Sequence, residues 1–220
     1  MRMRNQDIHS LVHQLENASR SWDVPAVTQV GRRSRDPFQV LISCLLSLRT
    51  KDEVTAPASA RLFSRARTPQ QLLSLPVRSI ERLIYPVGFY RTNARRIHQI
   101  CQHLLGRFLA KVTDRLEDLL TLPGVGRKTA NLVRTVGFKK LGICVDTHVH
   151  RISNRLGYVQ TKTPEQTEMA LRVKLPKRYW IRYNDLLVSF GQTLCKPISP
   201  FCSRCPVERY CAKVGVIHHR

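Results

Sequence analysis

Hydrophobic residues recur along most of the chain at the three- and four-residue spacing of an amphipathic helix, and strand-like alternation is almost absent. Four of these apolar stripes are Ile8, Leu11, Val12 and Leu15; Phe38, Leu41, Ile42, Leu45 and Leu46; Ala94, Ile97, Cys101, Leu104 and Leu105; and Trp180, Tyr183, Leu187 and Leu194. We expect an all-α protein of about ten helices, with most of the stripes buried in its core.

Helix starts are marked where a capping residue precedes a proline. The three such pairs are Asp36-Pro37, Thr68-Pro69 and Thr163-Pro164. Gln166 follows Thr163 at the spacing of a capping box. Pro57 lies inside a further apolar stretch, and its ring would clash with the carbonyl four residues back. The helix there is therefore expected to begin near Thr55 or Ala56.

The charge balance points to a polyanionic partner. Lys and Arg number 37 against 15 Asp and Glu, a net charge of +22 over 220 residues. The excess is spread along the chain, which predicts a basic face on a folded body and favours nucleic acid as the partner. No apolar run approaches the roughly 18 residues that span a bilayer, and no segment pairs a basic face with a Trp/Phe face, so we expect no membrane partner.

Four of the seven cysteines are clustered with the spacing C-x6-C-x2-C-x5-C. They are Cys195, Cys202, Cys205 and Cys211. Such a set suits either zinc or an iron–sulfur cluster, and the spacing does not choose between them. Two disulfides are the alternative, but Met1–Ser10 lacks the apolar region of an export signal, which favours metal ligands. Cys44, Cys101 and Cys144 lie among apolar residues and are expected in the core.

A glycine-rich turn, L-P-G-V-G-R-K-T-A at 122–130, separates two helical stretches. Gly124 and Gly126 permit backbone angles that are closed to other residues. The next helix starts directly after the turn, and its N–H groups and positive dipole end, with Arg127, suit a phosphate. This pattern is typical of a helix-hairpin-helix at about 115–137 that grips a nucleic-acid backbone without reading its sequence. The alternative is an ordinary tight helix–helix turn.

Two residues are candidates for chemistry. Lys128 lies in the first turn of the helix after the hairpin, where the helix dipole and Arg127 favour the neutral, nucleophilic amine. Its alternative role is a phosphate contact. Asp146, in C-V-D-T-H, is placed to cap a helix, or to act as a carboxylate near a developing cation or an attacking water. His148 suits either a phosphate contact or ordinary polar surface.

Together these motifs resemble the endonuclease III family of DNA glycosylases, within the helix-hairpin-helix superfamily. The resemblance is carried by L-P-G-V-G-R-K-T-A-N at 122–131, V-D-T-H at 145–148 and the four cysteines at their 6-2-5 spacing. Leu45-Leu46-Ser47 and Gly88-Phe89-Tyr90 also resemble DNA-facing loops of the family. The match covers most of the chain.

The resemblance implies two helical domains with a DNA-binding cleft between them. Residues 28–139 would form a six-helix barrel that contains the hairpin. Residues 1–27 and 140–220 would form a second domain holding a [4Fe–4S] cluster in the loop 195–211. The implied partner is double-stranded DNA with damaged bases or abasic sites. The implied protein is a monomer, cytoplasmic and nucleoid-associated in a prokaryote.

The resemblance also implies an activity, the removal of oxidised pyrimidines followed by β-elimination 3′ to the abasic site. Lys128 would attack C1′ of the flipped nucleotide, and Asp146 would stabilise positive charge on the sugar. The implied DNA contacts are Ser47, Arg49, Phe89, Gly124, Gly126, Arg127 and His148. Many family members carry glutamine at the position of Arg49, which leaves the opposite-base preference open. Phe89 is either a wedge between bases or a core residue beside Gly88.

Other functions remain open at this point. One is a related glycosylase for mismatched adenine or thymine, although Lys128 and the short segment after Cys211 argue against the adenine-specific relatives. Another is a non-enzymatic helix-hairpin-helix module with a structural metal, which the pairing of Lys128 with Asp146 disfavours. A redox-sensing role for the cluster is a further possibility.

Overall fold

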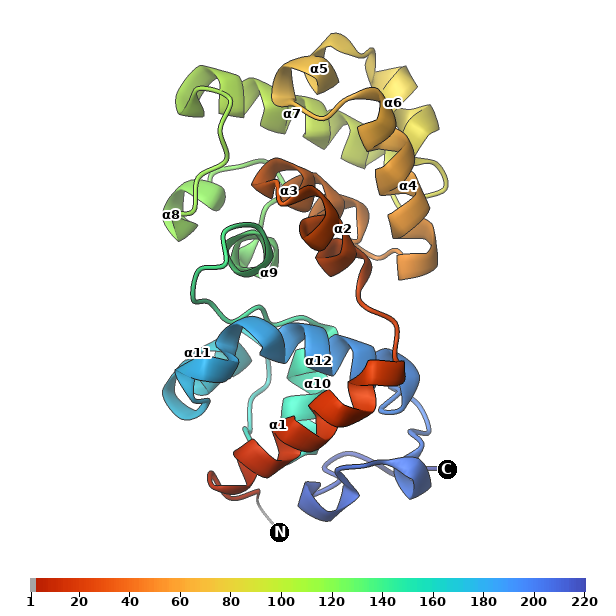
Figure 1. Ribbon diagram of the computed structural model, residues 1–220, viewed down its shortest axis with the longest axis vertical. Helices are drawn as coiled ribbons and strands as arrows, with labels where there is room; N and C mark the ends of the chain where they lie inside the picture. The colour runs from red at the N-terminus through yellow and green to blue at the C-terminus, as the bar shows by residue number, and fades with distance from the viewer. Residues whose placement is uncertain (1–2) are drawn as a thin grey trace. The chain divides into compact units, whose positions relative to one another are not determined.

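The computed structural model describes residues 3–220, and all regular structure within that range is helical, as predicted (Figure 1). The chain divides into two compact units. The central unit is Pro25–Gly142, and the terminal unit combines residues 3–24 with Ile143–Arg220. The barrel domain expected from the sequence runs from 28 to 139. No helix within residues 3–220 is long and apolar enough to cross a membrane.

The central unit is built around one largely buried helix, α3 (Pro37–Leu46). Its elements are α2 (Ala26–Ser34), α3 (Pro37–Leu46), α4 (Asp52–Arg65), α5 (Pro69–Ser74), α6 (Val77–Ile84), α7 (Tyr90–Phe108), α8 (Leu116–Leu119), α9 (Arg127–Leu132) and the π-helical turn η2 (Val133–Gly137). α3 packs against α2, α4, α7, α9 and η2. Every residue from 40 to 46 is buried, as expected for a helix that is apolar on all sides.

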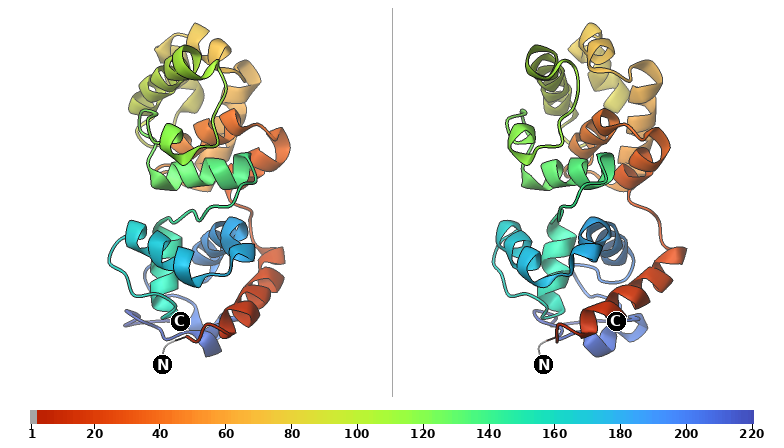
Figure 2. Two further views of the ribbon diagram at one scale, coloured as in Figure 1. Left: turned by 90° about the vertical axis from the view of Figure 1, so that its left-hand side faces the viewer. Right: turned by 60° about the vertical axis from the view of Figure 1, so that its left-hand side comes forward.

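The terminal unit joins segments from both ends of the sequence. Its elements are α1 (Asp7–Ala18), η1 (Ser19–Ser21), α10 (Thr147–Arg155), α11 (Pro164–Lys174), η3 (Lys177–Tyr179), α12 (Trp180–Thr193), η4 (Cys202–Arg204) and η5 (Glu208–Tyr210). Ile8, Leu11 and Leu15 of α1 share one hydrophobic core with Ile152 of α10 and Leu187 of α12. The red α1 and the blue segments of this unit accordingly lie together in Figures 1 and 2.

The predicted helix starts are confirmed. Asp36 accepts a hydrogen bond from the amide of the second following residue at 2.9 Å, and Thr68 and Thr163 each accept one from the third at 3.2 Å. The expected capping box differs in one detail. The Gln166 side chain accepts from the amide of Lys162, at 2.8 Å, so it reaches the residue before the cap.

The expected start of α4 is wrong, because the helix begins at Asp52 and contains Pro57. Two acidic residues, Asp52 and Glu53, occupy its first turn, where the positive end of the helix dipole stabilises them. The Thr55 hydroxyl also donates to the Lys51 carbonyl at 3.1 Å. These interactions hold the first turn in place, although Pro57 removes one N–H donor from the helix.

Candidate functional site

The hairpin of the central unit consists of α8, the turn and α9 with its extension η2. Val125 donates its amide to the Leu122 carbonyl at 3.1 Å, which closes the turn. Gly124 has φ +76°, and a Cβ there would lie 2.9 Å from Cδ of Arg96. Gly126 has φ −97°, and a Cβ there would meet nothing within 4 Å. The turn geometry therefore requires glycine at 124 and does not require it at 126.

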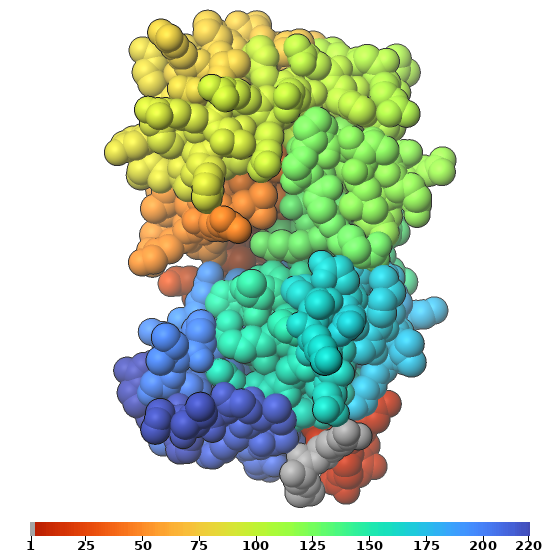
Figure 3. Space-filling view, turned by 180° about the vertical axis from the view of Figure 1, so that it is seen from behind, coloured from red at the N-terminus to blue at the C-terminus, as the bar shows by residue number. Residues whose placement is uncertain are grey.

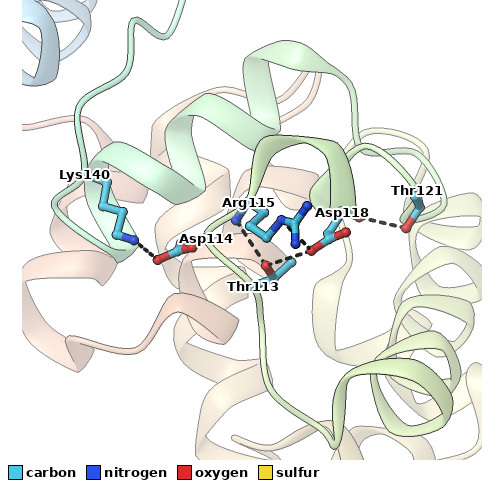
Figure 4. A network of polar contacts seen from close by, with 6 residues as sticks. All are labelled: Thr113, Asp114, Arg115, Asp118, Thr121 and Lys140. Atoms are coloured by element: carbon cyan, nitrogen blue, oxygen red, sulfur yellow. Dashed lines mark hydrogen bonds and ion pairs between the residues drawn. The ribbon is translucent and has the colours of Figure 1, made fainter.

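Polar contacts bracket the hairpin on both sides (Figure 4). The Arg115 amide donates to the Thr113 hydroxyl at 3.1 Å, and that hydroxyl donates to the Asp118 carboxylate at 3.3 Å. Lys140, just after η2, pairs with Asp114, just before α8. The hydrogen bond from Lys140 lowers the pKa of the Asp114 carboxyl. The two ends of the hairpin are thus tied together by charge as well as by packing.

Lys128 is the second residue of α9 and is partly buried. It lies close enough to the buried Cys44 of α3 for its charge to act there. Burial raises the pKa of the Cys44 thiol to about 12, and the positive charge of Lys128 opposes that rise. Lys128 therefore lies in the first turn of α9, a helix that packs against α3.

Arg49 and Phe89 are brought together from two separate loops. Their backbones both adopt the left-handed conformation, with φ 54° and 55°. The Arg49 guanidinium lies 5.5 Å from the centre of the Phe89 ring, and Phe89 is 61% exposed. The alternative placement of Phe89 in the core is therefore wrong. Two large, exposed residues held in the left-handed region are typical of a functional surface.

Close backbone contact joins these two loops. The Gly88 amide donates to the Thr50 hydroxyl at 3.0 Å, and a Cβ at Gly88 would lie 2.9 Å from the Arg49 carbonyl oxygen. The Asn93 side chain donates to the Gly88 carbonyl at 3.0 Å. Ser47 uses its hydroxyl locally, donating to the Cys44 carbonyl at 2.8 Å. The surface around Arg49 is thus fixed before any ligand binds.

In the terminal unit, Asp146 caps α10. Its carboxylate accepts from the Val149 amide at 2.9 Å, which confirms the capping role. The carboxylate is only partly buried, and its negative charge also acts on Arg151 one turn along the helix. Burial lowers the pKa of Arg151, as does the positive charge of Arg155, and negative charge on Cys195 and Asp146 only partly offsets this. Asp146 therefore combines a structural hydrogen bond with a charge that faces an arginine.

Arg151 connects the start of α10 with the cysteine loop. Its guanidinium donates to the Cys195 carbonyl at 2.8 Å and lies 3.1 Å from Nδ1 of His148. Gly191 of α12 makes room for this pair, because a Cβ there would collide with the His148 ring and approach Arg151 to 3.0 Å. One nitrogen of His148 is thus engaged inside the unit.

The four clustered cysteines line one pocket, together with apolar residues such as Leu156 and Val207. Arg155, only 7% exposed, lines this pocket and holds the cysteine loop. Its guanidinium donates to the sulfur of Cys195 at 3.3 Å and to the carbonyls of Lys196 and Pro197 at 2.9 and 3.1 Å. In Figure 3 the teal α10 and the dark-blue segment after the cysteines lie side by side, consistent with the hydrogen bond from the Val214 amide to the Arg155 carbonyl at 3.0 Å.

The donor set of this cavity suits a metal centre. Burial raises the pKa of the Cys205 thiol to about 12, and negative charge on the other three cysteines adds to the rise. Gathered thiolates need a compensating cation, which a metal centre supplies. Within residues 3–220 no three His, Cys, Asp or Glu side chains are arranged to hold a metal ion. What the structure provides is a thiol-lined cavity with a buried guanidinium on one sulfur.

Three of these functional contacts were not predicted from the sequence. Arg151 and Arg155 were not distinguishable among 37 basic residues, and Gly191 sits inside an apolar helix without a turn signal. Their spacing of four residues shows only that Arg151 and Arg155 share one face of α10, and not what that face contacts.

Residues 42–177 match the family model of the HhH-GPD superfamily of base excision DNA repair proteins. Endonuclease III of Thermotoga maritima is 51% identical over 181 residues, which cover 82% of this chain and 85% of that protein. The chain spans about half the length of two plant relatives that it also matches.

Two solved structures of endonuclease III with DNA resemble the fold. A non-covalent complex gives a TM-score of 0.85 at 32% identity, covering 96% of both chains. A trapped covalent intermediate gives a TM-score of 0.84 at 31% identity, covering 96% of this chain and 97% of that one. The hairpin, the helix-capping aspartate and the cysteine-lined cavity thus occur in a chain with extensive sequence and structural similarity to these enzymes, and the chain belongs to the endonuclease III family of base excision repair DNA glycosylases.

Proposed function

We propose that this glycosylase is bifunctional, removing oxidised pyrimidines from duplex DNA and then cleaving the strand 3′ to the abasic site. The observation that carries the proposal is Lys128, a partly buried amine in the first turn of the helix that follows the hairpin. A lysine in that position can act as a nucleophile toward an electrophilic carbon. Family membership supplies the substrate class, DNA with a damaged base.

The reaction begins once the damaged nucleotide is turned out of the stack, which costs least for a weakly paired base. The Lys128 nitrogen bonds to C1′ as the bond between C1′ and the base breaks. The base leaves with that electron pair and takes up a proton. The nitrogen then gives up one proton, and the sugar ring opens at its C1′–O4′ bond as O4′ keeps the electron pair and takes up a proton, giving an iminium between Lys128 and C1′. Loss of a C2′ proton breaks the C3′–O bond and releases the 3′ strand.

Asp146 supplies the negative charge for this sequence. Its carboxylate stabilises positive charge on the sugar as the base departs, and it helps to remove the proton from the lysine. The carboxylate is anchored by the Val149 amide, so its position costs no reorganisation during the reaction. We propose that Lys128 and Asp146 act on the same nucleotide.

The DNA contacts divide between backbone and bases. The hairpin, with Gly124, Gly126 and Arg127, grips phosphates, and His148 contributes from the start of α10. On the surface around Arg49, the exposed Phe89 wedges between bases. Arg49, held over the Phe89 ring, and Ser47 beside it face the partner base left behind by the flipped nucleotide.

The four cysteines are proposed to hold a [4Fe–4S] cluster. Such a group, when bound, supplies the positive charge that gathered thiolates require and ties the loop into one shape. The residues of this chain that serve it are Arg155, on the Cys195 sulfur, and Arg151, on the Cys195 carbonyl. This arrangement suits a structural role for the cluster, in which it shapes the loop 195–211.

A borohydride trapping assay tests the proposal. Duplex DNA with a single thymine glycol is incubated with the wild type and with Lys128→Gln, and the iminium is reduced to a stable amine. We expect a covalent protein–DNA complex with the wild type alone. Trapping on a plain abasic site but not on thymine glycol would keep the lyase and exclude this base. Absence of a complex on both substrates would exclude the lysine mechanism.

A further inference from the structure

Beside the Arg49–Phe89 pair lies a second group of aromatic and basic side chains, formed by Tyr85, Tyr90 and Arg91 and here called the tyrosine surface. Tyr85 is 60% exposed, and its ring meets that of Tyr90 edge to face with centroids 5.4 Å apart. The Arg91 guanidinium lies 5.4 Å from the centre of the Tyr90 ring. Tyr85 thus presents an exposed aromatic ring that is supported by the partly buried Tyr90, and exposed apolar surface of this kind can mark a binding site.

The loop that carries Tyr85 is held in place. The Arg61 guanidinium of α4 donates to the Leu83 carbonyl at 3.0 Å and to the Tyr85 carbonyl at 2.5 Å. These carbonyls belong to the end of α6 and the residue after it, where the helix itself provides no donors. The ring of Tyr85 is therefore presented on an ordered backbone, so binding on it loses little conformational entropy.

The surroundings carry positive charge. Tyr90 and Arg91 begin α7, a helix of 19 residues with no acidic residue in its first turn and no side-chain cap on its N-terminus. The positive end of the helix dipole thus lies at the tyrosine surface. The central unit as a whole has 21 of the 37 Lys and Arg but only 7 of the 15 Asp and Glu. An anionic partner with flat apolar groups complements such a surface.

We infer that the tyrosine surface binds unpaired nucleotides of DNA. A base stacks on the exposed Tyr85 ring, which Tyr90 supports from its edge, and the adjoining phosphate contacts Arg91 and the N-terminus of α7. Aromatic rings beside a basic track form the usual platform for single-stranded nucleic acid, since every base has a face that can stack. The site requires no lesion and no nucleophile, and it goes beyond the repair reaction proposed above. The protein accordingly holds single-stranded or bubble DNA through a contact that intact duplex does not make.

Fluorescence anisotropy on undamaged DNA tests this inference, with a short labelled oligo(dT) strand compared with a matched duplex. The variants are Tyr85→Leu, which keeps apolar volume, and Arg91→Gln. The matched controls are Phe108→Leu and Arg107→Gln at the opposite end of α7, where a guanidinium lies 5.9 Å from a ring but the helix dipole is negative. Phe108 and Arg107 thus reproduce the ring–guanidinium pair without the positive helix end.

We expect Tyr85→Leu to weaken oligo(dT) binding about tenfold and duplex binding less than about twofold, with both controls unchanged. The salt dependence of oligo(dT) binding by Tyr85→Leu should equal that of the wild type. Arg91→Gln should lower the slope of log K against the logarithm of the salt concentration by about one. Unchanged oligo(dT) binding in Tyr85→Leu would overturn the inference, as would an equal loss on duplex or an equal loss in Phe108→Leu. Because no damaged base is present, each outcome is independent of the trapping assay.

Discussion

The hairpin of the central unit and the cysteine loop of the terminal unit are both irregular segments at functional positions, but they are shaped in different ways. The hairpin is shaped by its own backbone, through the left-handed Gly124 and short-range contacts such as that of Thr113 with Asp118. The cysteine loop is shaped by a side chain from elsewhere, the buried Arg155, which is 40 residues distant from Cys195 in sequence. Substitutions within the hairpin should therefore disturb the hairpin, whereas the cysteine loop should be disturbed by substitution of the distant Arg155.

The largest expected effect separates chemistry from structure at Asp146. Asn caps helices as well as Asp does, so Asp146→Asn should keep α10 folded while removing the charge. We expect base release from a thymine glycol duplex, measured in single turnover, to slow by about 10²-fold or more. Binding to an uncleavable abasic analogue should stay within a few-fold of wild type. A comparable loss of that binding would make Asp146 a structural cap only.

The next effect concerns the distant anchor of the cysteine loop. Arg155→Met fills a similar volume but removes three hydrogen bonds, leaving the Lys196 and Pro197 carbonyls without this donor. We expect a loss of about 3–5 kcal/mol in the free energy of unfolding, together with loss of the iron and the visible absorbance that the proposed cluster would give. Arg204→Met is the matched control, because that exposed guanidinium lies 5.8 Å from the Phe201 ring and should matter little. Equal effects of the two substitutions would contradict the anchoring role.

A smaller effect distinguishes the two glycines of the hairpin. Gly124→Ala places a side chain on a left-handed residue and against Arg96, and we expect about 1–2 kcal/mol of destabilisation with weaker binding of undamaged duplex. Gly126→Ala meets open space at an ordinary φ, so we expect a change below about 0.5 kcal/mol. Denaturant unfolding and anisotropy on duplex DNA check both. Similar losses in the two variants would show that the turn itself does not determine the geometry.

The smallest expected effect depends on pH and concerns the Lys140–Asp114 ion pair, which joins the two ends of the hairpin. Lys140 lowers the pKa of Asp114 in the folded protein, so this pair stabilises the hairpin above the ordinary pKa of the carboxyl. The stabilisation is lost as the pH falls through the lowered value. The melting temperature of Asp114→Asn should therefore be slightly lower than that of the wild type at neutral pH. At acid pH the two melting temperatures should be equal. A difference that persists in acid would assign the effect to something other than the charge.

The features predicted correctly from sequence are those that short segments determine. The caps at Asp36 and Thr163 are local, because each uses an amide within three residues. The exposure of Phe89 could not be predicted from its neighbours, because Val87 and Gly88 are as compatible with a buried segment as with an exposed loop. The placement of Arg155 on a cysteine sulfur depends on how α10 packs in three dimensions, and no local pattern reports that packing.

The terminal unit draws its core from both ends of the sequence, and this affects the order in which the protein can form during synthesis. The central unit is continuous, so all of its residues have been made by Gly142, whereas α1 must wait for α10 and α12 before its apolar face is covered. Domains generally fold as units as they emerge. The hairpin is thus available to fold before Cys195, Cys202, Cys205 and Cys211 have been made, so the proposed cluster can be bound only after the central unit is complete.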